Sequence, residues 1–210
     1  MRLQKIFKRA AFAILMLTTV GLLFRGWFYR QLITYKSVGH RTNYFATNKQ
    51  LVDIIDANAD QENSIDIRQI IKLGLSITSE QLNFTAKKNE IDPNKLISSK
   101  TAHCVGYASF FATTCHYLLD KHNLAGTWIA KPQVGHLYFI GINVHQFFKS
   151  PFYKDHDFVT IENKTTGETF AVDPTLHDYF SIDFVAYSNP STVRTLTKLT
   201  RNNWSRGTFL

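Results

Sequence analysis

Apolar residues along this chain recur first at helical spacing and then, beyond about residue 123, at strand spacing. The helical spacing predicts helices over residues 50–57, 65–75 and 103–120. Later segments rich in β-branched and aromatic residues predict strands over 124–130, 136–144, 157–163 and 168–172. A run of helices followed by a run of strands favours an α+β fold, with a helix packed on an antiparallel sheet.

The first thirty residues contain an uncharged apolar stretch. Residues 10–24 carry no charge and follow a basic segment over residues 2–9. At about 1.5 Å per residue the stretch spans roughly 22 Å, and flanking Lys and Arg side chains extend its reach toward the ~30 Å core of a bilayer. Trp27 and Tyr29 suit the membrane interface. We expect residues 1–30 to form an uncleaved transmembrane helix, a signal anchor. A cleaved signal peptide is the alternative, but no small-residue cleavage site follows the stretch.

The net charge of +8 is concentrated at the N-terminus. Residues 1–40 carry seven Lys or Arg and no acidic residue, whereas residues 41–210 carry seventeen Lys or Arg against sixteen Asp or Glu. A nearly neutral body argues against a nucleic-acid partner. Four basic residues precede the apolar stretch and three lie in the fifteen residues after it. This small excess favours a single-pass protein with its domain on the extracytoplasmic side.

The remaining chain divides into three segments. Residues 31–48 show no periodicity and read as a tether. Residues 49–190 hold all the predicted domain helices and strands, enough for one hydrophobic core. Residues 191–210 form a basic C-terminal tail.

The two cysteines are expected to be free thiols. Cys104 and Cys115 are eleven residues apart in one predicted helix. That spacing separates them by roughly 16 Å along the helix axis, beyond the reach of a disulfide.

Cys104, His156 and Asp173 occur in an order and a local sequence that suit a catalytic triad. Cys104 lies in the first turn of the predicted 103–120 helix, where the helix dipole favours a thiolate. Stepping back four residues from Ala108 places Cys104 on the apolar stripe of that helix. A thiol is a strong nucleophile only as its thiolate, and a neighbouring imidazole that is held by a carboxylate favours that form. Taken singly, each residue also has a plain structural interpretation: a buried core cysteine, a solvated strand-end histidine and a turn aspartate.

The spacing of His156 and Asp173 fits a hydrogen bond across a hairpin. The strands over 157–163 and 168–172 flank Lys164-Thr165-Thr166-Gly167, a turn signal. A turn centred between Lys164 and Thr165 pairs His156 with Asp173, and a later centre shifts this pairing by a few positions.

The histidines do not form a recognisable metal motif. The sequence contains no HExxH and no CxxC. We therefore expect no metal and no other cofactor.

Three blocks of the sequence resemble the transglutaminase-like superfamily, the circularly permuted relatives of papain-like cysteine proteases. They are Cys104-Val105-Gly106-Tyr107-Ala108, His156-Asp157-Phe158-Val159 and Val172-Asp173-Pro174-Thr175. The resemblance covers roughly residues 95–180. It implies a papain-like core with Cys104 as nucleophile, His156 as base and Asp173 as the acid that orients the base.

The chain departs from the family pattern at several positions. Ala102 stands where the family commonly has Gly, Gly106 replaces an acidic residue, and Phe158 replaces the usual Trp. The upstream Trp of the animal cross-linking enzymes is also missing, since no Trp lies between Trp27 and Trp128. The backbone N–H of Cys104 is then the one candidate oxyanion donor.

The resemblance implies acyl transfer on an amide bond of a protein or peptide substrate. The extra β domains of the cross-linking enzymes are not recognised in this sequence, which favours hydrolysis by a peptidase or amidase over cross-linking. The alternative is a catalytically inactive transglutaminase-like binding module tethered to the membrane.

Overall fold

Most helices of the domain lie before residue 123, in the part of the chain whose apolar periodicity is helical. The computed structural model describes residues 2–59, 65–87 and 89–188. The domain helices are α3 (Lys49–Ala59), α4 (Ile67–Gln81), α5 (Pro93–Ser99), α6 (Cys104–Lys121) and α7 (Pro174–Phe180). Asp66 and Gln69 form a capping box that starts α4. Asp92 caps α5, and Pro93 fills its first turn, where no backbone N–H is needed.

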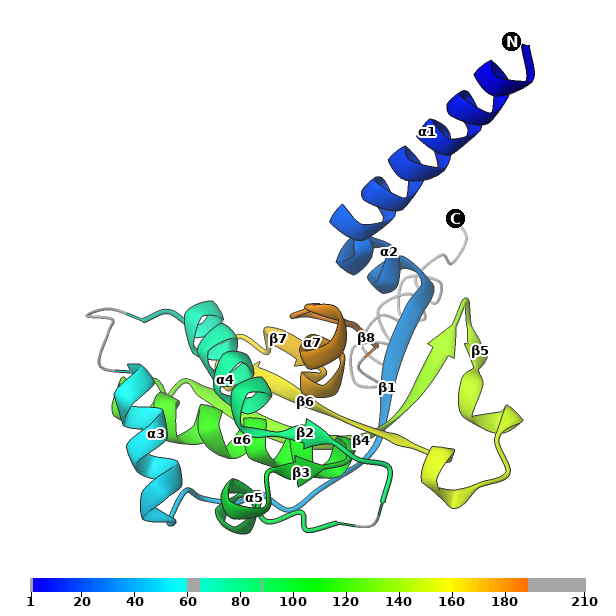
Figure 1. The fold of residues 1–210 in the computed structure, drawn as a ribbon. Coiled ribbons are helices and arrows are strands. Elements are labelled where there is room, and N and C mark those ends of the chain that lie inside the picture. Colours follow the sequence, from blue (N-terminus) through cyan, green and yellow to red (C-terminus); the bar gives the residue numbers. More distant parts are fainter. Residues whose placement is uncertain (1, 60–64, 88, 189–210) are drawn as a thin grey trace, which may run out of the picture.

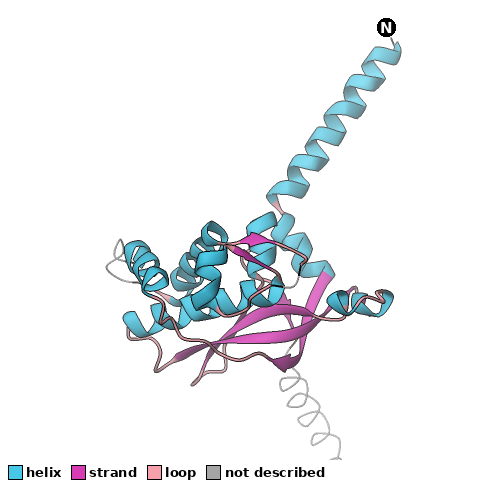
Figure 2. Cartoon of the chain, turned by 60° about the horizontal axis from the view of Figure 1, so that its bottom comes forward, coloured by secondary structure: helices cyan, strands magenta, loops and turns pink. Residues whose placement is uncertain are grey.

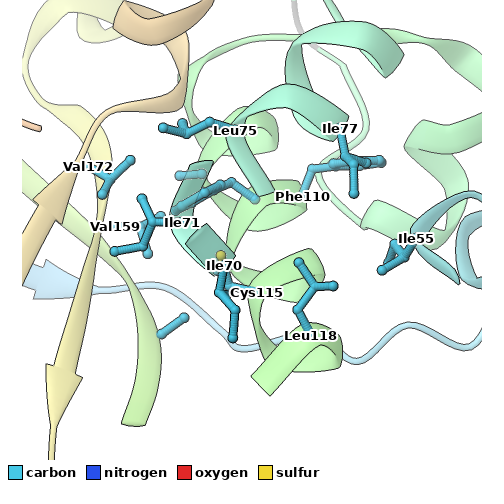
Figure 3. Close-up of a cluster of buried hydrophobic side chains, with 14 of the residues drawn as sticks. Ile55, Ile70, Ile71, Leu75, Ile77, Phe110, Cys115, Leu118, Val159 and Val172 are labelled. Atoms are coloured by element: carbon cyan, nitrogen blue, oxygen red, sulfur yellow. The ribbon is translucent and has the colours of Figure 1, made fainter. Parts of the chain in front are cut away.

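Helix α6 forms the centre of the main hydrophobic core. It packs against strands β4 and β6 on one side and against α4 on the other. Ten consecutive residues from Gly106 to Cys115 are buried, so the apolar stripe predicted from the sequence widens to the whole circumference. Figure 3 shows Cys115 and Leu118 of α6 among Ile70 and other apolar side chains. Each such buried aliphatic side chain stabilises the fold by about 1.5–3 kcal/mol.

The main sheet has the strand order β7-β6-β4-β1-β8, with the short β5 paired to β4. Its strands are β1 (Ile33–His40), β4 (Trp128–Phe139), β5 (Ile142–Asn143), β6 (His156–Asn163), β7 (Thr169–Val172) and β8 (Ala186–Tyr187). Pairings are antiparallel except that of β1 with β8. Strands β2 (Asn83–Phe84) and β3 (Thr101–Ala102) form a separate pair. Figures 1 and 2 show the domain helices gathered on one side of the main sheet.

The segment predicted as a tether is partly strand, which corrects the domain boundaries. Residues 33–40 form β1, which lies between β4 and β8. The hydrophobic pattern does not predict this strand, because only Tyr35 within it is fully buried. A β-bulge between Ser37 and Gly39 further breaks the alternation.

Strand β4 is also longer than the sequence predicts. The two strands expected over 124–130 and 136–144 are joined through the segment 131–135, which contains Pro132. The carbonyl of Pro132 accepts the N–H of Arg41, just after β1 ends at His40. The missing N–H of Pro132 therefore costs only the last bond of the β1–β4 ladder.

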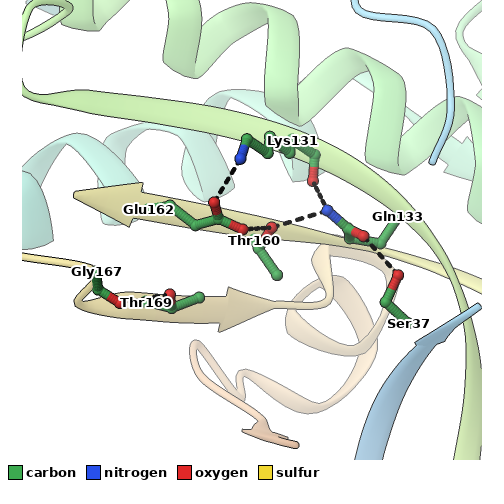
Figure 4. A network of polar contacts seen from close by, with 7 residues as sticks. All are labelled: Ser37, Lys131, Gln133, Thr160, Glu162, Gly167 and Thr169. Atoms are coloured by element: carbon green, nitrogen blue, oxygen red, sulfur yellow. Dashed lines mark hydrogen bonds and ion pairs between the residues drawn. The ribbon is translucent and has the colours of Figure 1, made fainter. Parts of the chain in front are cut away.

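Polar side chains tie the three central strands together (Figure 4). Gln133 is buried, donates to Thr160 Oγ1 at 2.9 Å and accepts from Ser37 Oγ at 2.7 Å. Lys131 and Glu162 pair at 2.5 Å. This network fixes the register of β4 against both β1 and β6, because each buried polar atom must find a partner.

The predicted N-terminal anchor consists of two helices. Helix α1 (Arg2–Leu23) extends away from the domain, and α2 (Arg25–Leu32) follows it after a break at Phe24 (Figure 1). Among the described residues no single helix is long and apolar enough to cross a membrane. Phe7–Leu23 together with Arg25–Leu32 meets that requirement by length and composition, but the pair is bent by 73°.

The α+β class predicted from the sequence is confirmed, whereas the transglutaminase-like assignment stays a prediction. The predicted basic tail over 191–210 lies outside the described residues.

Gly135 marks a close approach in the sheet that a mutation can test. A Cβ added there would lie 2.9 Å from Cδ1 of the buried Phe158 ring and closer still to Cε1. We predict that Gly135→Ala lowers the free energy of unfolding by about 1–3 kcal/mol, because the ring has no free space to move into. Urea-induced unfolding measures the loss. Gly126→Ala is the matched control, since nothing lies within 4 Å of its added Cβ; equal effects from the two variants would contradict the account.

Candidate active site

Cys104 lies at the N-terminus of α6, where the sequence predicted it. His103 caps the helix, and its Nδ1 accepts the N–H of Val105 at 3.3 Å. The thiol is only partly exposed. The N–H groups of the first turn have no acceptor within the helix, so this end of α6 favours negative charge.

His156 begins β6, and Asp173 follows β7 as the cap of α7. The observed register pairs Val159 with Val172, two residues away from the predicted pairing of His156 with Asp173. A shift of two residues keeps each side chain on its face of the sheet, so the predicted contact survives. His156 Nε2 lies 2.6 Å from Asp173 Oδ2.

The carboxylate of Asp173 receives four hydrogen bonds. Its Oδ1 accepts the backbone N–H groups of Thr175 and Leu176 at 3.0 and 3.1 Å. Its Oδ2 accepts Tyr35 Oη at 2.8 Å as well as His156 Nε2. Burial opposes ionisation, but the charge of His156 and these donors keep the pKa of Asp173 below its usual range.

His156 and Cys104 interact as an acid–base pair. Because Nε2 of His156 faces Asp173, Nδ1 is the ring nitrogen left for the thiol. Burial opposes the charged imidazole, yet Asp173 and Cys104 raise the pKa of His156 well above its ordinary value. Burial likewise opposes the thiolate, but hydrogen bonds from His103 and His156 and the charge of His156 lower the pKa of Cys104 to about 7. Near neutral pH the site therefore favours a thiolate–imidazolium pair.

Asp157 is buried beside the thiol and forms an ion pair with the partly exposed Arg41. Asp157 Oδ2 lies 3.9 Å from Cys104 Sγ. Arg41 binds the carboxylate through two nitrogens, with Nε 2.7 Å from Oδ1 and a terminal nitrogen 3.1 Å from Oδ2. The backbone N–H of Asp157 also favours the thiolate. Arg41 thus offsets a negative charge that would otherwise repel the nucleophile.

Cys115 lies in a different environment, as expected for a core cysteine. It is fully buried in the apolar core, and burial raises the pKa of its thiol above the ordinary value. Both cysteines are free, as predicted. Only Cys104 has a titratable partner that favours its thiolate form.

The arrangement is suited to nucleophilic chemistry at a carbonyl group. A thiolate, an imidazole that carries a proton and an orienting carboxylate follow one another in space. The N–H of Cys104 is a first-turn donor available to an oxyanion. Within the described part of the chain no group of three or more His, Cys, Asp or Glu residues is arranged to hold a metal ion.

Sequence reasoning missed four residues of this site. Two of them could have been found from the sequence. Asp157 is a charged residue at the edge of the mostly apolar run 158–161, and His103 directly precedes the nucleophile. Tyr35 and Arg41 gave none, because they lie in the segment predicted as a tether.

The pKa of Cys104 can be tested by alkylation. We predict that the rate constant for iodoacetamide rises to half its plateau near pH 7, because it follows the thiolate fraction. His156→Ala should move this midpoint toward the ordinary value of 9.0, since it removes both the hydrogen bond and the charge. Mass spectrometry of the labelled peptides identifies the thiol. Equal labelling of Cys115 in the folded chain would contradict the prediction.

The hydroxyl of Tyr35 can be removed without changing the ring. We predict that Tyr35→Phe lowers the free energy of unfolding at pH 7 by about 1.5–3 kcal/mol, the range for a hydrogen bond to a charged group. A carboxyl group whose pKa is lowered by folding contributes stability above its unfolded pKa and loses it as the pH falls through the folded value. The difference between wild type and variant should therefore shrink below about pH 3.8, the ordinary pKa of Asp. Denaturant titrations across this pH range measure it.

Tyr187→Phe is the matched control, because Tyr187 also packs against Phe158, with ring centroids 5.7 Å apart. Its effect should stay within about 0.5 kcal/mol. A loss for Tyr35→Phe that persists unchanged at low pH would exclude a role through the Asp173 charge.

No protein-family model, curated protein or solved structure matches this chain. What is stated of the site therefore comes from its own geometry. That geometry brings Cys104, His156 and Asp173 together.

Proposed function

We propose that this chain is a membrane-anchored, transglutaminase-like thiol enzyme that cleaves amide bonds of a protein or peptide. The observation that carries the proposal is that His156 contacts Asp173 at 2.6 Å and also lowers the pKa of the Cys104 thiol to about 7 through a hydrogen bond and its charge. A buried core cysteine would show the opposite shift, as Cys115 does.

The proposed reaction begins with attack of the Cys104 thiolate on the carbonyl carbon of the amide. A C–S bond forms, and the oxyanion accepts the N–H of Cys104 at the tip of α6. His156 then gives its Nδ1 proton to the leaving nitrogen as the C–N bond breaks, which leaves a thioester. Asp173 holds the imidazole in the required tautomer throughout.

Water completes the cycle. His156, now neutral, takes a proton from water as the oxygen attacks the thioester carbonyl. The C–S bond breaks, the acid leaves and the thiolate–imidazolium pair returns. The His156 side chain is 22 % exposed, which gives water the access to the ring that hydrolysis requires.

The membrane anchor in this proposal is α1. It is 22 residues long, about 33 Å, and contains the uncharged stretch over residues 10–24. Its apolar side chains, such as Leu17 and Leu23, are largely exposed, at 73 % each. Because the uncharged stretch alone spans roughly 22 Å, the anchor relies on flanking basic side chains that reach the headgroups, while lipid covers its exposed apolar side chains.

An activated ester tests the chemistry without knowledge of the natural substrate. With p-nitrophenyl acetate we predict a burst of nitrophenol equal to the number of chains, because the acyl-enzyme forms faster than it hydrolyses. Cys104→Ala should abolish the burst, and Asp173→Asn should slow acylation by about 10³–10⁴-fold. Cys115→Ala is the control and should retain it.

The alternatives give different results in the same assay. Addition of glycine ethyl ester should leave acetate as the main product; a predominance of the amide would make the enzyme a transferase. A folded chain with no burst, or a burst that survives Cys104→Ala, would overturn the enzyme assignment and favour an inactive binding module.

A further inference from the structure

The turn between β4 and β5 contains an unfavourable residue at an exposed position. Ile140 and Gly141 form a two-residue loop between the paired residues Phe139 and Ile142. Both loop residues have positive φ, 46° and 82°, as a type I′ turn requires. Such turns favour Asn, Asp or Gly, and a β-branched residue there is strained. The residue is also 66 % exposed, so its packing within the chain offsets little of this strain.

This turn lies directly beside the end of α2. The N–H of Ile140 donates to the carbonyl of Leu32 at 2.9 Å, and Phe139 pairs with Ile33. Figure 1 shows the β4–β5 hairpin and α1 projecting toward the same side of the domain. The strained isoleucine therefore lies at the C-terminal end of α2, one short helix away from the proposed anchor α1.

Helix α2 belongs to the domain rather than to the anchor. Tyr29 Oη is 2.8 Å from Tyr35 Oη in the buried site. Arg25 Nε donates to the carbonyl of Phe180 at 2.5 Å. These contacts hold α2 against β1 and α7, while α1 leaves at an angle of 73°. With α1 across a bilayer, a helix bent by 73° from it would run closer to the membrane plane than to its normal.

The turn and α2 together expose a set of large apolar side chains, which we call the apolar rim: Trp27, Phe28, Leu32, Phe139, Ile140 and Ile142. Each is at least 40 % exposed. Exposed apolar groups gathered in this way mark an interaction surface. Trp27 is of the kind enriched at the level of lipid headgroups.

The charges around the apolar rim favour an anionic partner. Residues 1–40 contain no acidic residue, and neither do residues 132–154, which include Lys149 and Lys154. The turn between β6 and β7, at the other end of the sheet, is by contrast flanked by Glu162 and Glu168. A surface with exposed apolar and aromatic side chains, in segments whose only charges along the chain are basic, is complementary to an anionic bilayer.

We propose that the apolar rim is a second membrane contact, in which the Ile140 turn and α2 enter the headgroup layer of an anionic bilayer. The inference rests on the proposed anchoring by α1 and adds a fixed orientation of the domain. Gly135, which pairs with His156, is five residues from Ile140 along β4. At about 3.3 Å per residue the catalytic histidine would lie within roughly 17 Å of the headgroups. Its substrates are then amides held close to the membrane surface.

Fluorescence quenching in vesicles tests the contact on the full-length chain. A Cys104→Ser background leaves the buried Cys115 as its only thiol, so an environment-sensitive NBD probe can be attached through Ile140→Cys. Thr166→Cys is the matched control, because Thr166 is exposed in the turn that follows Asn163. Asn163 pairs with Trp128, the first residue of β4, which lies about 36 Å from the Ile140 end of that strand. The vesicles contain equimolar phosphatidylcholine and phosphatidylglycerol, with a doxyl quencher near the headgroup. Flotation reports anchoring separately.

The expected result is a blue shift and quenching of the probe at 140, with neither at 166. If the chain floats with the vesicles but the probe at 140 still reports water, the second contact is overturned and the anchor is retained. A chain that does not float overturns both. Self-quenching at 140 that grows with the protein-to-lipid ratio would identify a second copy of the chain as the occupant and refute the lipid contact.

Ile140→Asn supplies a second test, because it installs the residue that the turn prefers. We expect the melting temperature in detergent to rise by about 2–4 °C as the backbone strain is relieved. Quenching of a probe attached through Ile142→Cys should at the same time be reduced. A variant that is no more stable, or that keeps full quenching at 142, would refute the role assigned to Ile140.

Discussion

The Asp173 carboxylate is a nearly buried negative charge, and the site is built around satisfying it. Such a group is costly to bury unless it is hydrogen-bonded and paired. Its donors come from separate parts of the chain: His156 from β6, Tyr35 from β1 and two N–H groups from the start of α7. The same bonds that make the charge tolerable also fix the imidazole, so stability and chemistry share one set of contacts.

The two cysteines show how the position on a helix decides the chemistry of a thiol. Cys104 and Cys115 lie on the same helix, α6, yet their pKa values shift in opposite directions. Cys115 is surrounded by apolar side chains, which penalise its charge. Cys104 is at the helix tip, where the thiolate meets two histidines and a backbone N–H. Desolvation acts on both thiols, and only Cys104 has partners that outweigh it.

Strand β1 connects the proposed membrane side of the molecule to the reaction centre. It begins directly after α2 and carries Tyr35, which bonds both Tyr29 of α2 and Asp173. Arg41 follows the end of the strand and neutralises Asp157 beside the thiol. A tilt of α2 would therefore move the hydroxyl groups of Tyr29 and Tyr35 and, through them, change the hydrogen bonding of the Asp173 carboxylate. This link gives the proposed membrane orientation a physical route to the site.

The sequence by itself determined the α+β class, the helix that starts at Cys104 and the proximity of His156 to Asp173, because these follow from local periodicity and a short hairpin. A two-residue error in register did not matter, since side chains in a strand alternate with a period of two. Only the tertiary structure decided that 33–40 is a strand, that Pro132 lies within β4, and that Tyr35, Arg41 and Asp157 belong to the site. Tyr35 and Arg41 bond partners more than a hundred residues away, and Pro132 is tolerated because of where β1 ends. Such contacts depend on which strands become neighbours, and no local pattern records that choice.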